Sequence, residues 1–260
     1  MLGNLVFVVG DNLASRSHAA GLVPLSRLGA LLDGEPASGS PPVIVPGQGI
    51  EAYEREILRS TLRSRGLPES LLVDVPLPTP LKHWEVHKRN PDNVLIAGLR
   101  RISENRFEAV LRISDRQEMV LDHTTGSHIT GMVITEGVRQ LSLAVGERFL
   151  LTPSRTPRRF ILNSLQTLFH KFLLPLPTRL EYTLEEVEHK GPDRLRFTGR
   201  CDVLQTDVLA ASGSMDMLVM EESRADRIEA RQIHETTHAL AELQERPALH
   251  EPERTRRLPL

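Results

Sequence analysis

The chain has 260 residues, of which 40% are hydrophobic and 25% charged, and this composition is typical of a soluble globular protein with one large or two modest domains. Its formal net charge of −2 provides no overall attraction to nucleic acid or to an anionic membrane surface. Its single cysteine, Cys201, excludes an intramolecular disulfide and a zinc site built on paired cysteines, and we expect a packed thiol in a strand.

The apolar run from Leu5 to Val9 is too short for the core of a signal peptide and has no basic flank before it. No stretch approaches the roughly 18 apolar residues that a membrane span needs. We therefore expect a cytoplasmic protein with neither a membrane nor nucleic acid among its partners.

Residues 1–78 alternate short apolar runs with helical patterns, and this order predicts a small α/β domain with parallel strands. The expected elements are a strand at 5–9, a helix around 25–32, a strand at 43–45, a helix at about 50–65 and a strand at 71–75. Three prolines at 76, 78 and 80 then indicate a linker, because proline interrupts both strand ladders and helices.

Residues 79–222 have the order of an α+β domain, in which strands precede and follow one apolar helix. The expected elements are strands at about 93–100 and 106–114, a helix at 131–149, and strands at 178–188, 195–205 and 208–220. One antiparallel sheet wrapped around one helix satisfies this order. Residues 223–260 are densely charged, and we expect a solvated helix followed by a disordered tail.

The expected central helix carries three polar residues among apolar ones. Glu136, Arg139 and Gln140 fall at i, i+3 and i+4, which places them on one face. A structural ion pair is one interpretation, with the histidines just upstream exposed in a loop. The other is a functional site, since an unpaired polar cluster is costly to bury and this helix lies at the centre of the expected fold.

The segment from Gly131 to Gln140, preceded by an Asp-His-x-x-Gly-x-His run that begins at Asp122, resembles the A-factor biosynthesis (AfsA-type) hotdog family. Val86–Val94 is similar to the opening strand motif of that family, and Phe160–Asn163 to the strand after its helix. The resemblance covers about residues 85–220. It implies a hotdog fold, in which an antiparallel sheet wraps a central helix, preceded here by the small α/β domain.

The resemblance also implies an acyltransferase that moves a β-ketoacyl group from an acyl carrier protein, or a related acyl-CoA, to the hydroxyl of dihydroxyacetone phosphate in butyrolactone-type signal biosynthesis. No cofactor and no metal is expected. We predict that burial raises the pKa of Glu136 toward neutral, as suits a general base, and that Arg139 holds a phosphate or an oxyanion. The expected site residues are Glu136, Arg139 and His123 as catalytic groups, with His128, Gln140, Gly131, His87, Lys88 and Asn163 in substrate binding.

The sequence departs from the family in one respect, because typical members carry two hotdog repeats, whereas the family's helical motif occurs here once, at 131–140, with no second copy in the first 80 residues. We therefore expect a homodimer. Hotdog β-hydroxyacyl-carrier-protein dehydratases give an alternative in which His123 and Glu136 perform acid–base chemistry, and thioester hydrolysis is related to it. A non-catalytic module that binds acyl groups or carrier proteins is the third class.

Three further motifs are weaker. His234-Glu-Thr-Thr-His238 matches the zincin pattern, but its surroundings are polar almost throughout, so we expect no metal there. Gly47-Gln-Gly49 after a strand is compatible with a phosphate-binding turn or, as we favour, with a tight turn. Arg155, Arg158 and Arg159 could contact a phosphate or a carrier protein, although solvated loop charge is the expected role.

Overall fold

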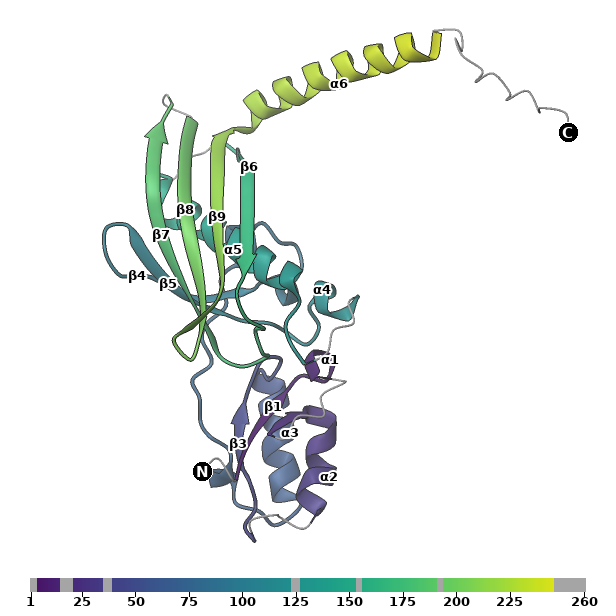
Figure 1. The fold of residues 1–260 in the computed structure, drawn as a ribbon, viewed down its shortest axis with the longest axis vertical. Coiled ribbons are helices and arrows are strands. Elements are labelled where there is room, and N and C mark those ends of the chain that lie inside the picture. Colours follow the sequence, from purple (N-terminus) through teal and green to yellow (C-terminus); the bar gives the residue numbers. More distant parts are fainter. Residues whose placement is uncertain are drawn as a thin grey trace, which may run out of the picture.

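The structure is a computed structural model, and it describes residues 4–14, 21–34, 39–122, 127–152, 156–190 and 194–245. Its elements form two parts that follow each other along the long axis of the molecule (Figure 1). The N-terminal part, residues 4–78, is called the N-terminal unit below and contains a three-stranded parallel sheet. The second part contains a six-stranded antiparallel sheet.

The N-terminal unit has the β-α-β order that its sequence predicts. Its strands are β1 (Leu5–Val9), β2 (Leu22–Pro24) and β3 (Val43–Pro46), and its helices are α1 (Asp11–Ala14), α2 (Leu28–Asp33) and α3 (Ala52–Arg63). The sheet order is β2-β1-β3. Apolar residues of the strands and helices share one small core: Val8, Leu28, Ile44, Ile50, Leu58 and Leu62.

The predicted strand at 71–75 is wrong. A single parallel bridge joins Leu72 to Ile44, and the N–H of Val75 then donates to the carbonyl of Val73 at 3.1 Å, which turns the chain away from the sheet. The third strand is instead β2, which the sequence did not reveal because it has three residues and ends at Pro24. A run this short carries no measurable periodicity.

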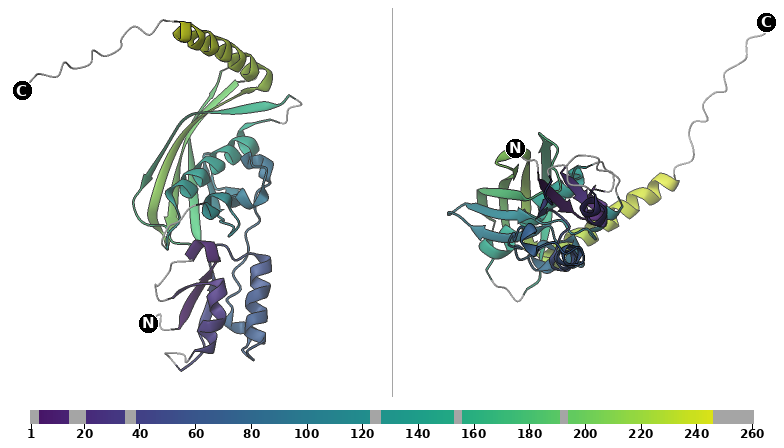
Figure 2. Two further views of the ribbon diagram at one scale, coloured as in Figure 1. Left: turned by 90° about the vertical axis from the view of Figure 1, so that its right-hand side faces the viewer. Right: turned by 90° about the horizontal axis from the view of Figure 1, so that it is seen from below.

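The second part confirms the predicted hotdog fold. Its elements are β4 (Ile96–Arg101), β5 (Arg106–Leu111), α4 (Glu118–Leu121), α5 (Gly131–Val145), β6 (Arg158–Phe169), β7 (Thr178–His189), β8 (Arg194–Gln205) and β9 (Val208–Glu221). The strands are arranged β4-β5-β7-β8-β9-β6, and the curved sheet wraps one side of α5 (Figure 2). We call this part the hotdog domain.

The core of the hotdog domain lies between α5 and the concave face of the sheet. Val138 of α5 packs against Gly213 of β9, where an added Cβ would lie 2.7 Å from the Val138 side chain. Residues that alternate along β9, such as Met215 and Met217, are buried against the helix. Cys201 is fully buried in β8, as predicted, and burial raises the pKa of its thiol. A packed thiol of this kind is no nucleophile.

The helix α6 (Glu222–Glu245) leaves the end of β9 and runs away from the sheet (Figure 1). Ala225 is buried at its start, and Arg159 of β6 forms ion pairs with Glu222, Asp226 and Glu229. The side chains from 226 to 243 are exposed, in agreement with the predicted solvated helix. The tail predicted beyond it lies outside the described residues.

Candidate functional site

The three polar residues of α5 form a cluster with a fourth residue from outside the helix. The Arg139 guanidinium donates to both carboxylate oxygens of Glu136, from Nε at 2.7 Å and from Nη2 at 2.8 Å. Lys88, which precedes β4, places its Nζ 2.7 Å from Glu136 Oε1, and the Gln140 amide donates to the same oxygen at 3.0 Å. We call Lys88, Glu136, Arg139 and Gln140 the α5 cluster.

The carboxylate at the centre of this cluster is ionised. Burial by itself raises the pKa of Glu136, but hydrogen bonds from Arg139, Lys88 and Gln140 outweigh it and lower the pKa to about 2. The prediction of a pKa raised toward neutral is therefore wrong. The sequence indicated the burial but did not reveal that Lys88 would join Arg139. A carboxylate held by two cations is a poor general base and a good anchor.

Gln140 fixes the segment that covers the outer side of α5. Its Oε1 accepts from the N–H of Leu95 and its Nε2 donates to the carbonyl of Asn93, both at 2.8 Å, and the side chain is fully buried. Since Val138 faces the sheet, Gln140 and Glu136 lie on the opposite side of the helix. The α5 cluster therefore sits between α5 and the chain that leads into β4, not between α5 and the sheet.

Two of the predicted substrate-binding residues lie away from the α5 cluster. His87 has a left-handed backbone, its Nε2 is 3.0 Å from Glu147 Oε1, and its ring packs edge-on against Phe160. Asn163 donates to Asp216 at 3.1 Å. Asp216 alternates with the buried Met215 and Met217, so Asn163 lies on the outer face of the sheet. Asn163, expected in substrate binding, is therefore not brought together with the α5 cluster.

A groove separates the N-terminal half of α5 from the edge strand β6. It encloses about 400 Å³ and is lined by Thr130, Gly131, Met132, Thr135, Leu165, Thr167 and Phe169. Gly131 suits this place because an added Cβ would lie 2.9 Å from the Phe169 ring. The hydroxyl of Thr167 is buried and has no hydrogen-bond partner among the described residues. We call this feature the α5–β6 groove.

The groove and the α5 cluster adjoin each other along the helix. Met132, Thr135 and Arg139 fall at i, i+3 and i+7, so the side of α5 that lines the groove continues to Arg139. His128, two residues before the groove residue Thr130, has its ring 4.7 Å from the ring of Phe172. His123 lies outside the described residues.

The remaining motifs have structural explanations. The imidazoles of His234 and His238 contact each other edge-to-face on the exposed α6, and within the described ranges there is no group of three His, Cys, Asp or Glu residues that could hold a metal ion. Arg159 forms an ion pair with Glu222 of α6, and Arg158 donates to the carbonyl of Thr152. Arg155 lies outside the described residues. The N–H groups of residues 47–49 all bond to backbone carbonyls, which excludes the phosphate-binding interpretation of that turn.

Comparison with known proteins identifies the family. The sequence matches the family described as "AfsA: A-factor biosynthesis hotdog domain" over residues 73–221, which is more than half of the chain. The chain belongs to this family. The matched range contains every element from β4 to β9, so it includes the α5 cluster and the α5–β6 groove. Most of the N-terminal unit and α6 lie outside it.

Solved structures with similar folds include AziG of S. sahachiroi, a thioesterase of Haemophilus influenzae and a mutant thioesterase of Pseudomonas aeruginosa. Their sequences are 17%, 12% and 11% identical to this chain, with TM-scores of 0.32, 0.32 and 0.36. The matches cover 47%, 48% and 48% of this chain and 90%, 78% and 81% of those chains. No curated protein sequence matches.

Among the described helices, none combines the length and the apolar character that crossing a membrane requires.

Proposed function

We propose that this protein is an acyltransferase that moves a β-ketoacyl or related group from a carrier-protein thioester to a small hydroxylated acceptor such as dihydroxyacetone phosphate. The observation that supports it most directly is the convergence of Lys88 and Arg139 on the single carboxylate of Glu136. The cluster has net positive charge, and the Lys88 and Arg139 side chains remain 25% and 24% exposed. An anionic acceptor or a developing oxyanion fits such a place.

The α5–β6 groove is the proposed place of the acyl chain. Met132, Leu165 and Phe169 give it apolar walls, while the threonines of α5 and β6 offer hydroxyl groups. A chain in the groove would bring its thioester toward Arg139, because Thr135 and Arg139 lie on the same side of α5. This arrangement places the apolar and the charged parts of the substrate on adjoining surfaces.

The roles within the reaction follow from these charges. The acceptor hydroxyl attacks the thioester carbon, its proton passes to a base, and the carrier thiol leaves as it regains a proton. Glu136 is too weak a base for this step, so in our proposal it anchors Arg139 and Lys88, while His128 beside the groove accepts the proton. Arg139 then stabilises the oxyanion or holds the acceptor phosphate.

The test is to incubate the protein with β-ketoacyl and β-hydroxyacyl carrier proteins, with and without dihydroxyacetone phosphate, and to read the product masses. Acyl transfer requires a product that contains the acceptor. Free acid without acceptor dependence would indicate a thioesterase, and loss of water from the β-hydroxyacyl group a dehydratase. No turnover with tight acyl-carrier binding would indicate a binding module and overturn the enzyme proposal.

Variants then test the assignment to the α5 cluster. We expect Arg139→Lys to raise the KM for the acceptor about 10-fold, because the two-pronged contact of arginine is lost. Lys88→Ala should act in the same direction. Lys190→Ala is the matched control, since Lys190 also forms one ion pair, with Glu188 at 3.2 Å, and is 32% exposed. Equal effects of Lys88→Ala and Lys190→Ala would contradict the assignment.

We also propose a homodimer formed along β6. This strand is 12 residues long and lies at the edge of the sheet, where Leu162 and Phe169 are 43% and 54% exposed. An exposed apolar strand edge pairs readily with another strand. In sedimentation, Leu162→Glu should dissociate the dimer, whereas Val187→Glu, at a site 39% exposed on β7, should not. A monomer at micromolar concentration before any substitution would contradict the proposal.

A further inference from the structure

The turn that follows β3 is buried against the hotdog domain. The N–H of Gln48 donates to the carbonyl of Pro175, and the N–H of Gly49 to the carbonyl of Ile113, both at 2.9 Å. The Gln48 side chain is 8% exposed; it accepts from the N–H of Ile113 at 2.8 Å and donates to the carbonyls of Leu111 at 2.9 Å and Leu176 at 3.3 Å. One side chain thus holds two segments of the hotdog domain.

A second contact lies beside the first. Asn12 of α1 donates to Asp115 from its backbone N–H, at 2.9 Å, and from its side chain to the Asp115 backbone carbonyl and carboxylate, at 3.1 and 3.2 Å. A Cβ added at Gly10 would collide with the Asp115 carboxylate, so only glycine allows this approach. The N–H of Gly10 donates to the carbonyl of Gln48 at 2.9 Å, which joins the two contacts into one.

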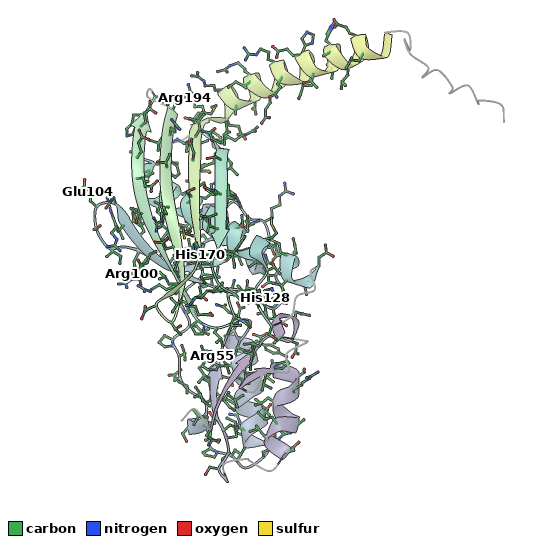
Figure 3. All side chains as sticks on the ribbon, viewed as in Figure 1. Arg55, Arg100, Glu104, His128, His170 and Arg194 are labelled. Carbon is green, nitrogen blue, oxygen red and sulfur yellow. The ribbon has the colours of Figure 1, made fainter. Side chains whose placement is uncertain are left out.

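One of the two segments held by the N-terminal unit leads directly to the α5–β6 groove, and the other precedes the elements that enter it. Residues 170–176 follow Phe169, which forms one wall, and residues 111–116 precede α4 and the chain that enters α5. The N–H of Ile129 donates to the carbonyl of Leu173 at 2.7 Å, so the chain that enters α5 is bonded to residues 170–176. Figure 3 shows His128 and His170 at the end of the hotdog domain nearest the N-terminal unit.

We propose that the N-terminal unit sets the width of the acyl-binding groove, with Gln48 as the positioning residue. Phe169 and Thr130 both line the groove: Phe169 precedes the 170–176 segment that Gln48 holds, and Thr130 follows Ile129, which is bonded to Leu173 of that segment. Displacements of about 1 Å in such walls are enough to impair a bound substrate's alignment. The assignment of an acyl chain to the groove rests on the proposed function, but the positioning itself does not.

The test compares the full chain with Gln48→Glu, which keeps the side-chain shape and replaces the donating amide by a carboxylate facing two carbonyl oxygens. Amide hydrogen exchange is read at Ile129 and at residues 170–176 in the absence of any substrate. We expect exchange there to quicken about 10-fold, while Val203 in β8 exchanges as before. Gln232→Glu on the exposed α6 is the matched control for the added charge, and it should leave the exchange rates at Ile129 and at residues 170–176 unchanged.

Unchanged exchange at Ile129 in a folded Gln48→Glu chain would overturn the proposal, and so would an equal rise throughout the hotdog domain. If Gln48→Glu does not fold, Asn12→Ala gives the same two outcomes at the more exposed contact. With an active enzyme, Gln48→Glu should raise the KM for the acyl thioester about fivefold and leave kcat within about twofold. Faster exchange in a protein without transferase activity would refute the proposed function and support the positioning role.

Discussion

Two buried glutamines, Gln140 in the hotdog domain and Gln48 in the N-terminal unit, make the same hydrogen bonds in different surroundings. Each accepts from one backbone N–H and donates to the carbonyl two residues earlier, as a neighbouring strand would. The partners are Leu95 and Asn93 for Gln140, at 2.8 Å each, and Ile113 and Leu111 for Gln48, at 2.8 and 2.9 Å. Both therefore fix the path of a chain that leads into or out of the sheet.

The two differ in their third partner. Gln140 also donates to the ionised Glu136 at 3.0 Å, whereas Gln48 also donates to the neutral carbonyl of Leu176 at 3.3 Å. The first glutamine is thereby coupled to charges, and the second couples one loop of the hotdog domain to another. We expect the stability of the region around Gln140 to depend strongly on pH and on its ion pairs. The stability of the region around Gln48 should depend instead on how closely the N-terminal unit packs against the hotdog domain.

The largest effect on the free energy of unfolding is expected from Gln140→Leu. It leaves the N–H of Leu95 and the carbonyl of Asn93 buried without partners and removes one donor from Glu136. Each unsatisfied buried group costs about 1–3 kcal/mol, so the free energy of unfolding should fall by roughly 3–5 kcal/mol. Urea unfolding measures it. Gln166→Leu, at an exposed position of β6, is the control, and an equal loss in both variants would contradict the explanation.

The position of Gln140 was within reach of the sequence because the local pattern carries that information, whereas its bonds to Leu95 and Asn93 were not, and Gln140 was expected in substrate binding. The spacing of Glu136, Arg139 and Gln140 is enough to place all three on one helical face, and the apolar residues between them fix which face is buried. The alternating apolar residues of β7, β8 and β9 similarly predicted three strands to within one residue at each end. Local periodicity thus determined most of the hotdog fold.

The role of Gln48 and the ion pair between Lys88 and Glu136 were not within reach, although the family resemblance had already placed Lys88 among the expected site residues. Gln48 bonds to a residue 65 positions away in the sequence. Lys88 lies outside the helix that carries Glu136, so the helical spacing of α5 gives no sign that the two side chains are in contact. A glycine-flanked turn after a strand has the same local sequence whether its amides face a ligand or another domain. Such contacts are set by the packing of the two parts, which periodicity does not encode.

A second, somewhat smaller effect is expected from Glu136→Gln. The pKa of Glu136 falls from 4.5 to about 2 on folding, so its carboxylate contributes about 3 kcal/mol of stability. Because the folded pKa is the lower one, this contribution is complete above pH 4.5 and is lost as the pH falls toward 2. Urea unfolding of both chains from pH 7 to pH 2 should show a difference that shrinks over that window. A difference independent of pH would contradict the ionised anchor.

The smallest effect is expected from Asp115→Asn in the contact between the two parts, and its pH dependence has the opposite sign. Burial raises the pKa of the Asp115 carboxyl above its ordinary value of 3.8, although the Asn12 N–H donates to it. A group whose folded pKa is the higher one contributes stability below pH 3.8 and loses it as the pH rises through the folded value. Asparagine cannot lose that proton, and its carbonyl oxygen can still accept from Asn12.

Asp115→Asn should therefore gain stability relative to the original chain as the pH rises from below 3.8 to neutral. The gain should be smaller than the loss in Glu136→Gln, because the Asp115 carboxyl is only half buried and solvent screens its charge. Urea unfolding of the original chain and of the Asp115→Asn and Glu136→Gln variants over one pH series measures how each stability difference changes with pH. Differences that move in the same direction with pH would show that the two carboxyl groups occupy equivalent surroundings. The contrast between the charged cluster of α5 and the neutral contact at Gln48 would then be wrong.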